Sequence, residues 1–258
     1  MNYVPAGLSG MRRGKAHNPF AKRAFDLLVA ASALFVLSPL LLIAALAIKL
    51  TSDGPVFFRQ PRYGRDWRVF NVYKLRTLDH DRCDAPGARV VKPVGEHDSR
   101  VFPVGRFLRA RGIDEIPQLW NVVRGDMSIV GPRPHALPHD DYYRANIPGY
   151  ALRYIVRPGI TGWAQVNGSR GQIRNLDDAR QRLIFDLHYI ERASVLFDFE
   201  ICLRTAQILV LGTDPKPRYP RLPHSARAAR SPAAVAHDRV EQPGRRQHRL
   251  PDQIGSRR

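Results

Sequence analysis

The sequence contains few cysteines and few acidic residues. Its only two cysteines, Cys83 and Cys202, lie far apart, and neither has a Cys-x-x-Cys pattern or a Cys/His cluster near it. Neither a disulfide framework nor a structural zinc site is therefore predicted, and we expect two free thiols. Asp and Glu number 23 against 41 Lys and Arg, which gives a net charge of +18. This balance favours polyanionic partners: nucleic acid, an anionic membrane surface, or the phosphates of nucleotides and lipids.

Composition divides the 258 residues into distinct parts. Residues 1–19 carry Gly, Pro and basic side chains without apolar periodicity, which indicates a mobile basic arm. An apolar helix is expected at 20–50 and one folded domain at 51–212, because 44% hydrophobic content in a chain of this length supports a core. Residues 213–258 change to Pro, Arg, His and Ala with few large apolar side chains, which predicts a disordered basic tail.

One uncharged apolar run extends from Leu27 to Ile48. A straight helix of about 20 such residues spans a bilayer, and we expect a permanent membrane anchor rather than a cleaved signal peptide. Pro39 lies near the middle of the run and predicts a kink at Ser38-Pro39. Basic residues flank both ends, so the positive-inside rule places neither end outside. Two topologies stay open here: a helix that enters, breaks and returns to the same side, and a kinked helix that spans.

The part after the anchor is predicted to be α+β and mainly helical. Apolar and polar residues alternate in Pro55–Gln60 and Trp67–Arg76 around the turn residues 63–66, which predicts a short β-hairpin. Helical patterns follow at Val101–Arg111, Pro117–Val123, His139–Ala145 and Asp177–Leu211. The last is the longest, and its apolar stripe is expected to pack into a core or to lie in the headgroup plane.

Asp114 and Glu115 are adjacent acids in a stretch rich in arginine. Pro117 follows them, so the pattern is typical of a helix start with Asp114 near the N-cap, and a structural cap is one interpretation. The other is phosphate chemistry, because a helix N-terminus attracts phosphate and would keep Asp114 ionised. Neighbouring residues on a helical turn point about 100° apart. We therefore expect separate roles for the two carboxylates rather than a shared proton.

Two further motifs contain groups that suit phosphates. Gly131-Pro132-Arg133-Pro134 combines a rigid backbone with the planar guanidinium fork of an arginine. As a bare pattern it is a plain turn, but in combination with the Asp-Glu-x-x-Gln-Leu stretch that begins at Asp114 it is highly specific. The stretch Arg157–Gly168 contains three glycines and predicts a tightly turned loop.

These motifs, in this order and with the apolar run upstream, resemble the bacterial sugar transferases, which are monotopic polyprenyl-phosphate phosphoglycosyl transferases that start surface glycan assembly. The resemblance covers residues 20–212 and implies a re-entrant helix-break-helix with a small cytosolic catalytic domain. It implies that Asp114 is the nucleophile and that Glu115 is a Mg²⁺ ligand. It also implies phosphate contacts from Arg109, Arg133, Lys74 and Arg76, and nucleotide or sugar contacts from Gln165 and Trp163.

The implied activity is transfer of a sugar-1-phosphate, with glucose-1-phosphate preferred, from a UDP-sugar to undecaprenyl phosphate through a covalent aspartyl sugar-phosphate, with release of UMP. It would start exopolysaccharide or other surface glycan synthesis at the cytoplasmic face of the bacterial inner membrane. Membrane lipids are expected partners and downstream glycosyltransferases are further candidates. No nucleic acid is expected, since the tail lacks aromatic residues other than Tyr219. Galactose-1-phosphate or N-acetylhexosamine-1-phosphate transfer and a non-catalytic membrane-bound scaffold remain as alternatives.

Overall fold

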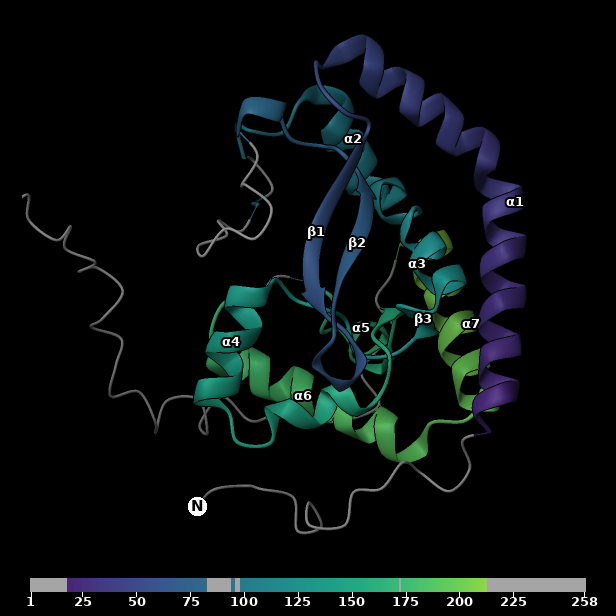
Figure 1. Cartoon of the computed structure of the whole chain (residues 1–258), viewed down its shortest axis with the longest axis vertical. Coiled ribbons are helices and arrows are strands. Elements are labelled where there is room, and N and C mark those ends of the chain that lie inside the picture. Colours follow the sequence, from purple (N-terminus) through teal and green to yellow (C-terminus); the bar gives the residue numbers. More distant parts are fainter. Residues whose placement is uncertain (1–17, 83–93, 96–97, 172, 213–258) are drawn as a thin grey trace, which may run out of the picture. The chain divides into compact units, whose positions relative to one another are not determined.

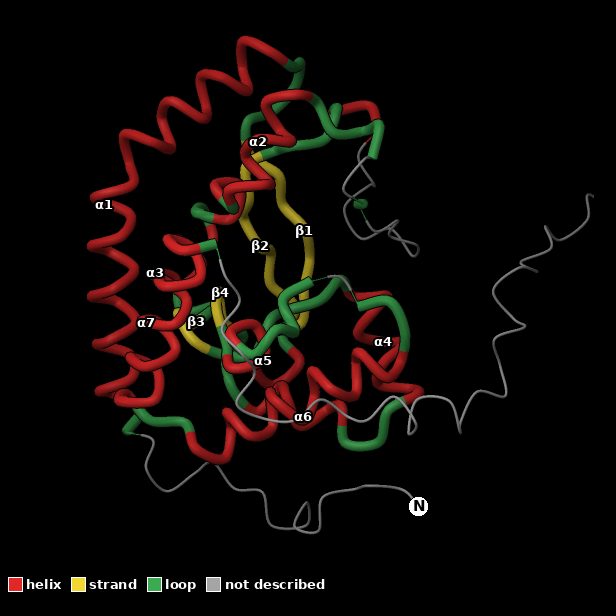
Figure 2. Tube along the Cα trace, turned by 180° about the vertical axis from the view of Figure 1, so that it is seen from behind, coloured by secondary structure: helices red, strands yellow, loops and turns green. Residues whose placement is uncertain are grey.

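The computed structural model describes residues 18–82, 94–95, 98–171 and 173–212. Within these ranges the chain is mainly helical with two separate two-stranded sheets, so the α+β prediction is confirmed (Figure 1 and Figure 2). The predicted basic arm up to residue 17 and the predicted disordered tail lie outside the described residues, as does Cys83. Cys202 is a free thiol.

The first helix, α1 (Pro19–Thr51), is the expected apolar helix, one residue longer at each end than predicted. Asn18 caps it, because its side chain accepts hydrogen bonds from the backbone N–H groups of Phe20 and Ala21. The most apolar 18-residue window has a mean hydropathy of 2.6, and only 11% of it is buried. By length and composition the helix is able to cross a membrane.

The proline in α1 bends the helix without ending it (Figure 1). Pro39 has no N–H to donate to the carbonyl of Phe35 in the preceding turn. The hydroxyl of Ser38 donates to that carbonyl instead, at 2.8 Å, so the acceptor is satisfied within an apolar helix. The predicted kink at Ser38-Pro39 thus lies inside one continuous helix.

Both ends of α1 are attached to the rest of the domain. Near its start, Lys22 pairs with Asp26 at 2.8 Å and with Asp198 at 2.9 Å in a buried cluster. Near its end, Ile48 is buried in an apolar cluster that includes Leu75. Large apolar side chains are exposed along the helix: Leu28, Phe35, Val36, Leu42, Ile43, Leu46 and Leu50.

The strands β1 (Phe57–Tyr63) and β2 (Val69–Leu75) form the predicted antiparallel hairpin. Their alternating pattern places one face inward, so Val72 is buried while Val69 is exposed. The hairpin matters for the site because β2 carries Lys74, whose side chain donates to Glu115.

Short elements follow the hairpin: α2 (Pro103–Arg111), α3 (Gln118–Arg124), β3 (Ser128–Val130), α4 (Leu137–Asn146), β4 (Gly159–Thr161) and α5 (Trp163–Val166). The strands β3 and β4 pair in parallel. The predictions for α2, α3 and α4 are confirmed to within two residues at either end.

The prediction of one helix over Asp177–Leu211 is wrong. The segment forms two helices, α6 (Leu176–Arg192) and α7 (Val195–Leu211). Ser194 separates them with an extended backbone, and its side chain accepts a hydrogen bond from the N–H of Phe197 at 3.2 Å. A serine N-cap starts a new helix here, although the apolar stripe continues through it.

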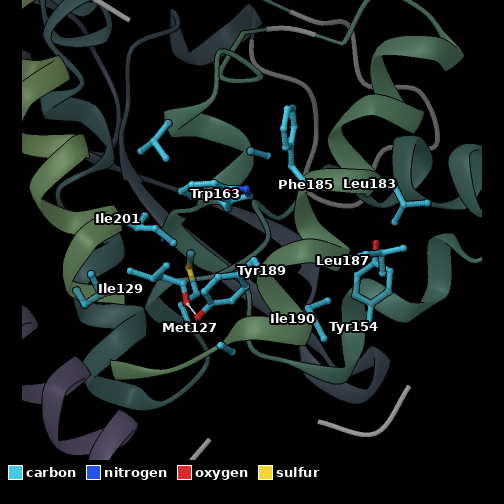
Figure 3. Close-up of a cluster of buried hydrophobic side chains, with 14 of the residues drawn as sticks. Met127, Ile129, Tyr154, Trp163, Leu183, Phe185, Leu187, Tyr189, Ile190 and Ile201 are labelled. Atoms are coloured by element: carbon cyan, nitrogen blue, oxygen red, sulfur yellow. Dashed lines mark hydrogen bonds between the residues drawn. The ribbon is translucent and has the colours of Figure 1, made fainter. Parts of the chain in front are cut away.

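The main core lies where α5, α6 and α7 meet β3 (Figure 3). Trp163, Tyr189 and Ile201 are buried in it. The hydroxyl of Tyr189 lies 2.8 Å from the carboxylate of Asp198 and 3.0 Å from the carbonyl of Val130. The core thereby connects the ion pairs of α1 to the strand that leads into the Gly-Pro-Arg-Pro motif.

Candidate active site

Asp114 and Glu115 lie in a tight 3-10 turn, Ile113–Glu115, between α2 and α3. Gly112 ends α2 with a φ of +69°, a left-handed backbone that suits glycine. The helix α3 begins only at Gln118, and no side chain caps it. The prediction that Asp114 lies near a helix N-cap is therefore wrong, because the chain makes a separate turn before the helix.

Glu115 is the centre of an ion-pair cluster. Lys74 donates to its Oε1 at 2.7 Å. Arg133 contacts both carboxylate oxygens, with Nη1 at 2.9 Å from Oε2 and Nη2 on Oε1. Burial alone would raise the pKa of Glu115, but Arg133 and Lys74 outweigh burial and hold the pKa well below its usual 4.5. The two cations, which come from distant segments, are aligned by one ionised carboxylate.

Asp114 has a different environment from its neighbour. It is 6% exposed, and its carboxylate accepts no hydrogen bond from the residues that the structure describes. Burial raises its pKa above the usual 3.8, against the opposing pull of Lys74, Arg109 and Arg133. Nearby cations, rather than the expected helix N-terminus, favour its ionised form. A poorly solvated carboxylate beside three cations has the properties of an activated nucleophile.

Arg109 approaches Asp114 from the last turn of α2. Its Nη1 donates to the hydroxyl of Thr77 at 3.3 Å. Gly105, in the same helix, lies so close to Thr77 that a Cβ there would come within 2.4 Å of the Thr77 carbonyl oxygen. Glycine thus lets α2 pack directly on the chain after β2, which places Arg109 beside the acidic pair.

The loop that carries Arg133 is held by its backbone. A Cβ on Gly131 would lie 2.5 Å from the carbonyl oxygen of Arg157, so only glycine permits this packing. Arg153 donates to the carbonyl of Arg133 at 2.7 Å and pairs with Asp186 of α6 at 2.9 Å. The loop is therefore fixed by tertiary contacts as well as by its prolines.

Three residues proposed from the sequence lie away from this cluster. Arg76 is 2% exposed, and its guanidinium donates to the hydroxyl of Ser52 at 2.7 Å and to the carbonyl of Ser52 at 3.0 Å. It joins the end of α1 to the hairpin. Trp163 is 3% exposed within the core (Figure 3). Gln165 is 8% exposed and donates to a backbone carbonyl at 3.0 Å. In the structure all three act in packing.

A cavity of about 220 Å³ lies beside the cluster. Lys74 and Arg133 line it together with two arginines that the sequence analysis missed, Arg62 and Arg182. Arg182 is 6% exposed on the inward side of α6. The signal for it was an arginine at a position where the helical period requires a buried side chain. Arg62 gave no comparable signal, because charged residues are ordinary on an alternating strand.

The acidic pair offers oxygen donors to a hard divalent ion. Mg²⁺ favours one or two carboxylates completed by water and substrate phosphates, and Asp114 with Glu115 meets that description. Both oxygens of Glu115 contact cations. A phosphate that draws Lys74 or Arg133 away from Glu115 would free a Glu115 oxygen to bind the ion. Among the described residues no group of three or more His, Cys, Asp or Glu side chains forms a separate metal site.

Residues 17–212 match the model of the family described as bacterial sugar transferase. The chain belongs to the bacterial sugar transferase family. The resemblance drawn from the motifs is therefore confirmed, and the matched span includes α1, the acidic pair, the Gly-Pro-Arg-Pro motif and both C-terminal helices.

This bacterial sugar transferase is 53% identical over 193 residues to the UDP-glucose:undecaprenyl-phosphate glucose-1-phosphate transferase of Caulobacter vibrioides. The match covers 75% of this chain and 70% of that protein. It is 48% identical over 211 residues to the protein of the same name from Escherichia coli, which covers 80% of this chain but 43% of that protein. It is 44% identical over 188 residues to the exopolysaccharide production protein PSS of Rhizobium leguminosarum. This match covers 71% of this chain and 92% of that protein. The chain thus spans less than half of the Escherichia coli relative.

Proposed function

We propose that this bacterial sugar transferase moves glucose-1-phosphate from UDP-glucose to undecaprenyl phosphate and releases UMP. The observation that carries the proposal is the buried Asp114 carboxylate beside Lys74 and Arg133. Such a carboxylate suits attack on phosphorus, and the cations suit phosphate oxygens. The names of the Caulobacter and Escherichia relatives support the donor and the acceptor. The name of the Rhizobium relative supports a role in exopolysaccharide synthesis.

Two displacements at one phosphorus account for the transfer. In the first, an oxygen of ionised Asp114 attacks the β-phosphorus of UDP-glucose and forms a bond to it. The bond from that phosphorus to the oxygen shared with the α-phosphate breaks, and its electron pair leaves with UMP. Glucose-1-phosphate then remains on Asp114 as an acyl phosphate. In the second, a phosphate oxygen of undecaprenyl phosphate attacks the same phosphorus, and Asp114 departs as a carboxylate.

Charge repulsion is the main obstacle, because the nucleophile, the donor and the acceptor are all anions. Glu115 holds Lys74 and Arg133 beside Asp114 before the donor binds, so either cation needs only a short movement from Glu115 to a phosphate oxygen. Arg109 adds a third positive charge beside Asp114. These cations oppose the charge that develops at the transferred phosphorus.

We also propose that Mg²⁺ takes part, held by Glu115 together with phosphate oxygens of the substrate. The ion would supply further neutralisation of the diphosphate. Chelation with EDTA is then expected to stop UMP release, and added MgCl₂ to restore it. Unchanged release in EDTA would exclude this role for a divalent ion.

A monotopic arrangement at the cytoplasmic face of the inner membrane suits this chemistry. Both ends of α1 are attached to one domain, at Lys22 and at Ile48, whereas a spanning helix carries its ends to opposite sides. The bend at Pro39 and the exposed apolar side chains support a helix that enters the membrane and returns. Asp114 would then lie at the depth of the lipid phosphate.

The test is UMP release from the purified full chain in nanodiscs with Mg²⁺. The donors are UDP-glucose, UDP-galactose and UDP-N-acetylhexosamines, each with and without undecaprenyl phosphate. Sustained, acceptor-dependent release is expected with UDP-glucose. It should be lost in Asp114→Asn and retained in Asp141→Asn, which changes an acid that is 45% exposed. A different preferred donor would mean that another sugar is transferred. No release from folded protein with any donor would favour the alternative of a non-catalytic membrane-bound scaffold.

A further inference from the structure

The cavity beside the acidic pair contains two arginines without an acidic partner. Lys74 and Arg133, which line it, both pair with Glu115. Arg62 and Arg182 also line it, and neither forms a salt bridge with a carboxylate in the part of the chain that the structure describes. The cavity is therefore lined by two guanidinium groups without a directly paired carboxylate, while Asp186 acts on Arg182 and Asp140 and Glu115 act on Arg62 at longer range.

Arg182 is oriented by a buried histidine. Its Nη1 lies 3.2 Å from Nε2 of His135, and its own Nε is buried without a hydrogen-bond partner. Burial and the charge of Arg153 lower the pKa of His135 to about 3, so the ring is neutral. Nη1 of Arg153 lies 2.9 Å from the other ring nitrogen, Nδ1, which is 3.1 Å from the Asp140 carboxylate. Arg182 also donates from Nη2 to the carbonyl of Gly171 at 2.7 Å, so His135 and Gly171 together hold the guanidinium.

The electrostatics distinguish these arginines from their neighbours. Burial and repulsion from Arg133 lower the pKa of Arg62 to about 10. Burial also lowers the pKa of Arg182 to about 10, opposed by Asp186 and assisted by repulsion from Arg153 and Arg133. The pKa of Arg133, by contrast, is raised by its partner Glu115. An anion entering the cavity would offset the burial of these two charges and their repulsion from neighbouring arginines.

The cavity lies next to the acidic pair but does not include Asp114. Lys74 and Arg133 are the groups common to both, because they line the cavity and also act on Asp114. In a phosphoryl transfer the attacking and leaving oxygens lie roughly in line. When Asp114 attacks a β-phosphorus held by Lys74 and Arg133, the α-phosphate leaves on the side away from Asp114, and the cavity that these two cations line does not include Asp114.

We propose that Arg62 and Arg182 form the leaving-group site, which binds the α-phosphate of the nucleotide donor and hence the phosphate of UMP. This inference rests on the proposed function. The cavity is smaller than the roughly 300–1,000 Å³ of sites that enclose a whole small ligand, so it suits one part of the donor. A lipid phosphate has the same chemistry, but the cavity is lined from β1, α4 and α6 rather than from α1, which carries the exposed apolar side chains.

Equilibrium binding of UMP to the full chain in nanodiscs, measured by calorimetry, tests the proposal. Arg182→Gln and Arg62→Gln are each expected to weaken UMP binding about tenfold or more, because each removes a charge-assisted contact to phosphate. Arg180→Gln is the matched control, since Arg180 lies on the same helix, is 40% exposed and pairs with Asp177. Its UMP affinity should equal that of the wild type. Undecaprenyl phosphate in the same discs should bind all of these proteins equally.

Three results would overturn the inference. The first is equal UMP affinity in the wild type and both cavity variants, which leaves the proposed function intact. The second is weaker binding of undecaprenyl phosphate with unchanged UMP affinity, which assigns the cavity to the lipid phosphate. The third is no UMP binding by the wild type, which overturns the proposed function as well. If Arg182→Gln does not fold, as judged by thermal unfolding, Arg62→Gln decides, because Arg62 is a half-buried strand residue.

Discussion

Asp114 is subject to opposing effects on its charge. Burial favours the protonated form, and Lys74 and Arg109 favour the ionised form. A nucleophile that is ionised yet poorly solvated is reactive toward phosphorus. The residue types in this stretch left a structural cap and phosphate chemistry open, and the resemblance to the family assigned the roles of the acidic pair. The roles of Arg76 and Trp163 were not predictable in the same way, because a cation or an aromatic residue near a motif can equally be buried in packing.

The pH dependence of the first displacement follows from this balance. The proposed reaction needs ionised Asp114, whose pKa in the folded protein lies above the usual 3.8. UMP release is therefore expected to fall with decreasing pH around a midpoint above that value. Lys74 lowers this pKa, so Lys74→Gln should move the midpoint to higher pH, whereas Arg180→Gln should leave it in place. The measurement is kcat/KM for UMP release against pH, and an unmoved midpoint in Lys74→Gln would show that another group titrates.

The same balance predicts an effect on stability. A carboxyl whose pKa is raised on folding is less stable as an anion in the folded protein than in the unfolded chain. Its ionisation therefore costs stability at neutral pH, and this cost disappears as the pH falls below both pKa values. Asp114→Asn should unfold at the same or a higher temperature than the wild type at pH 7, with any gain lost in acid. A clearly lower unfolding temperature at pH 7 would contradict the raised pKa.

At the scale of elements, sequence periodicity located most helices and the hairpin but not every boundary. The alternation on either side of Tyr63 was strong enough to give β1 and β2. The division between α6 and α7 was missed because the apolar stripe continues across Ser194, while the break depends on one side-chain hydrogen bond. In α1 the hydroxyl of Ser38 satisfies the carbonyl freed by Pro39, so the helix continues through the site of the predicted kink.

The proposed topology of α1 predicts which side of the membrane its ends face. Phe20→Cys and Thr51→Cys, placed one at a time in a background without Cys83 and Cys202, report on the two exposed ends of the helix. Both are expected to react with a membrane-impermeant thiol reagent in inverted vesicles and not in intact spheroplasts. Labelling of the two ends from opposite sides would establish a spanning helix and contradict the monotopic proposal.

At the scale of the whole molecule, the site is assembled from segments far apart in the sequence. Lys74 comes from the hairpin, the acidic pair from the turn after α2, Arg133 from the loop after β3, and Arg182 from α6. The types of these residues are visible in the sequence, but their convergence is a tertiary property. Arg182 in particular depends on a contact with His135, 47 positions away in the chain, and no local pattern predicts such a contact.

The central claim is that Asp114 carries the transferred group. The most direct measurement is the mass of the protein and of its Asp114 peptide after incubation with UDP-glucose and Mg²⁺ but without undecaprenyl phosphate. The account predicts a gain of one hexosyl phosphate on that peptide, absent from Asp114→Asn, and its loss when undecaprenyl phosphate is added. Acceptor-dependent UMP release without any such adduct, or with an adduct on another residue, would contradict it.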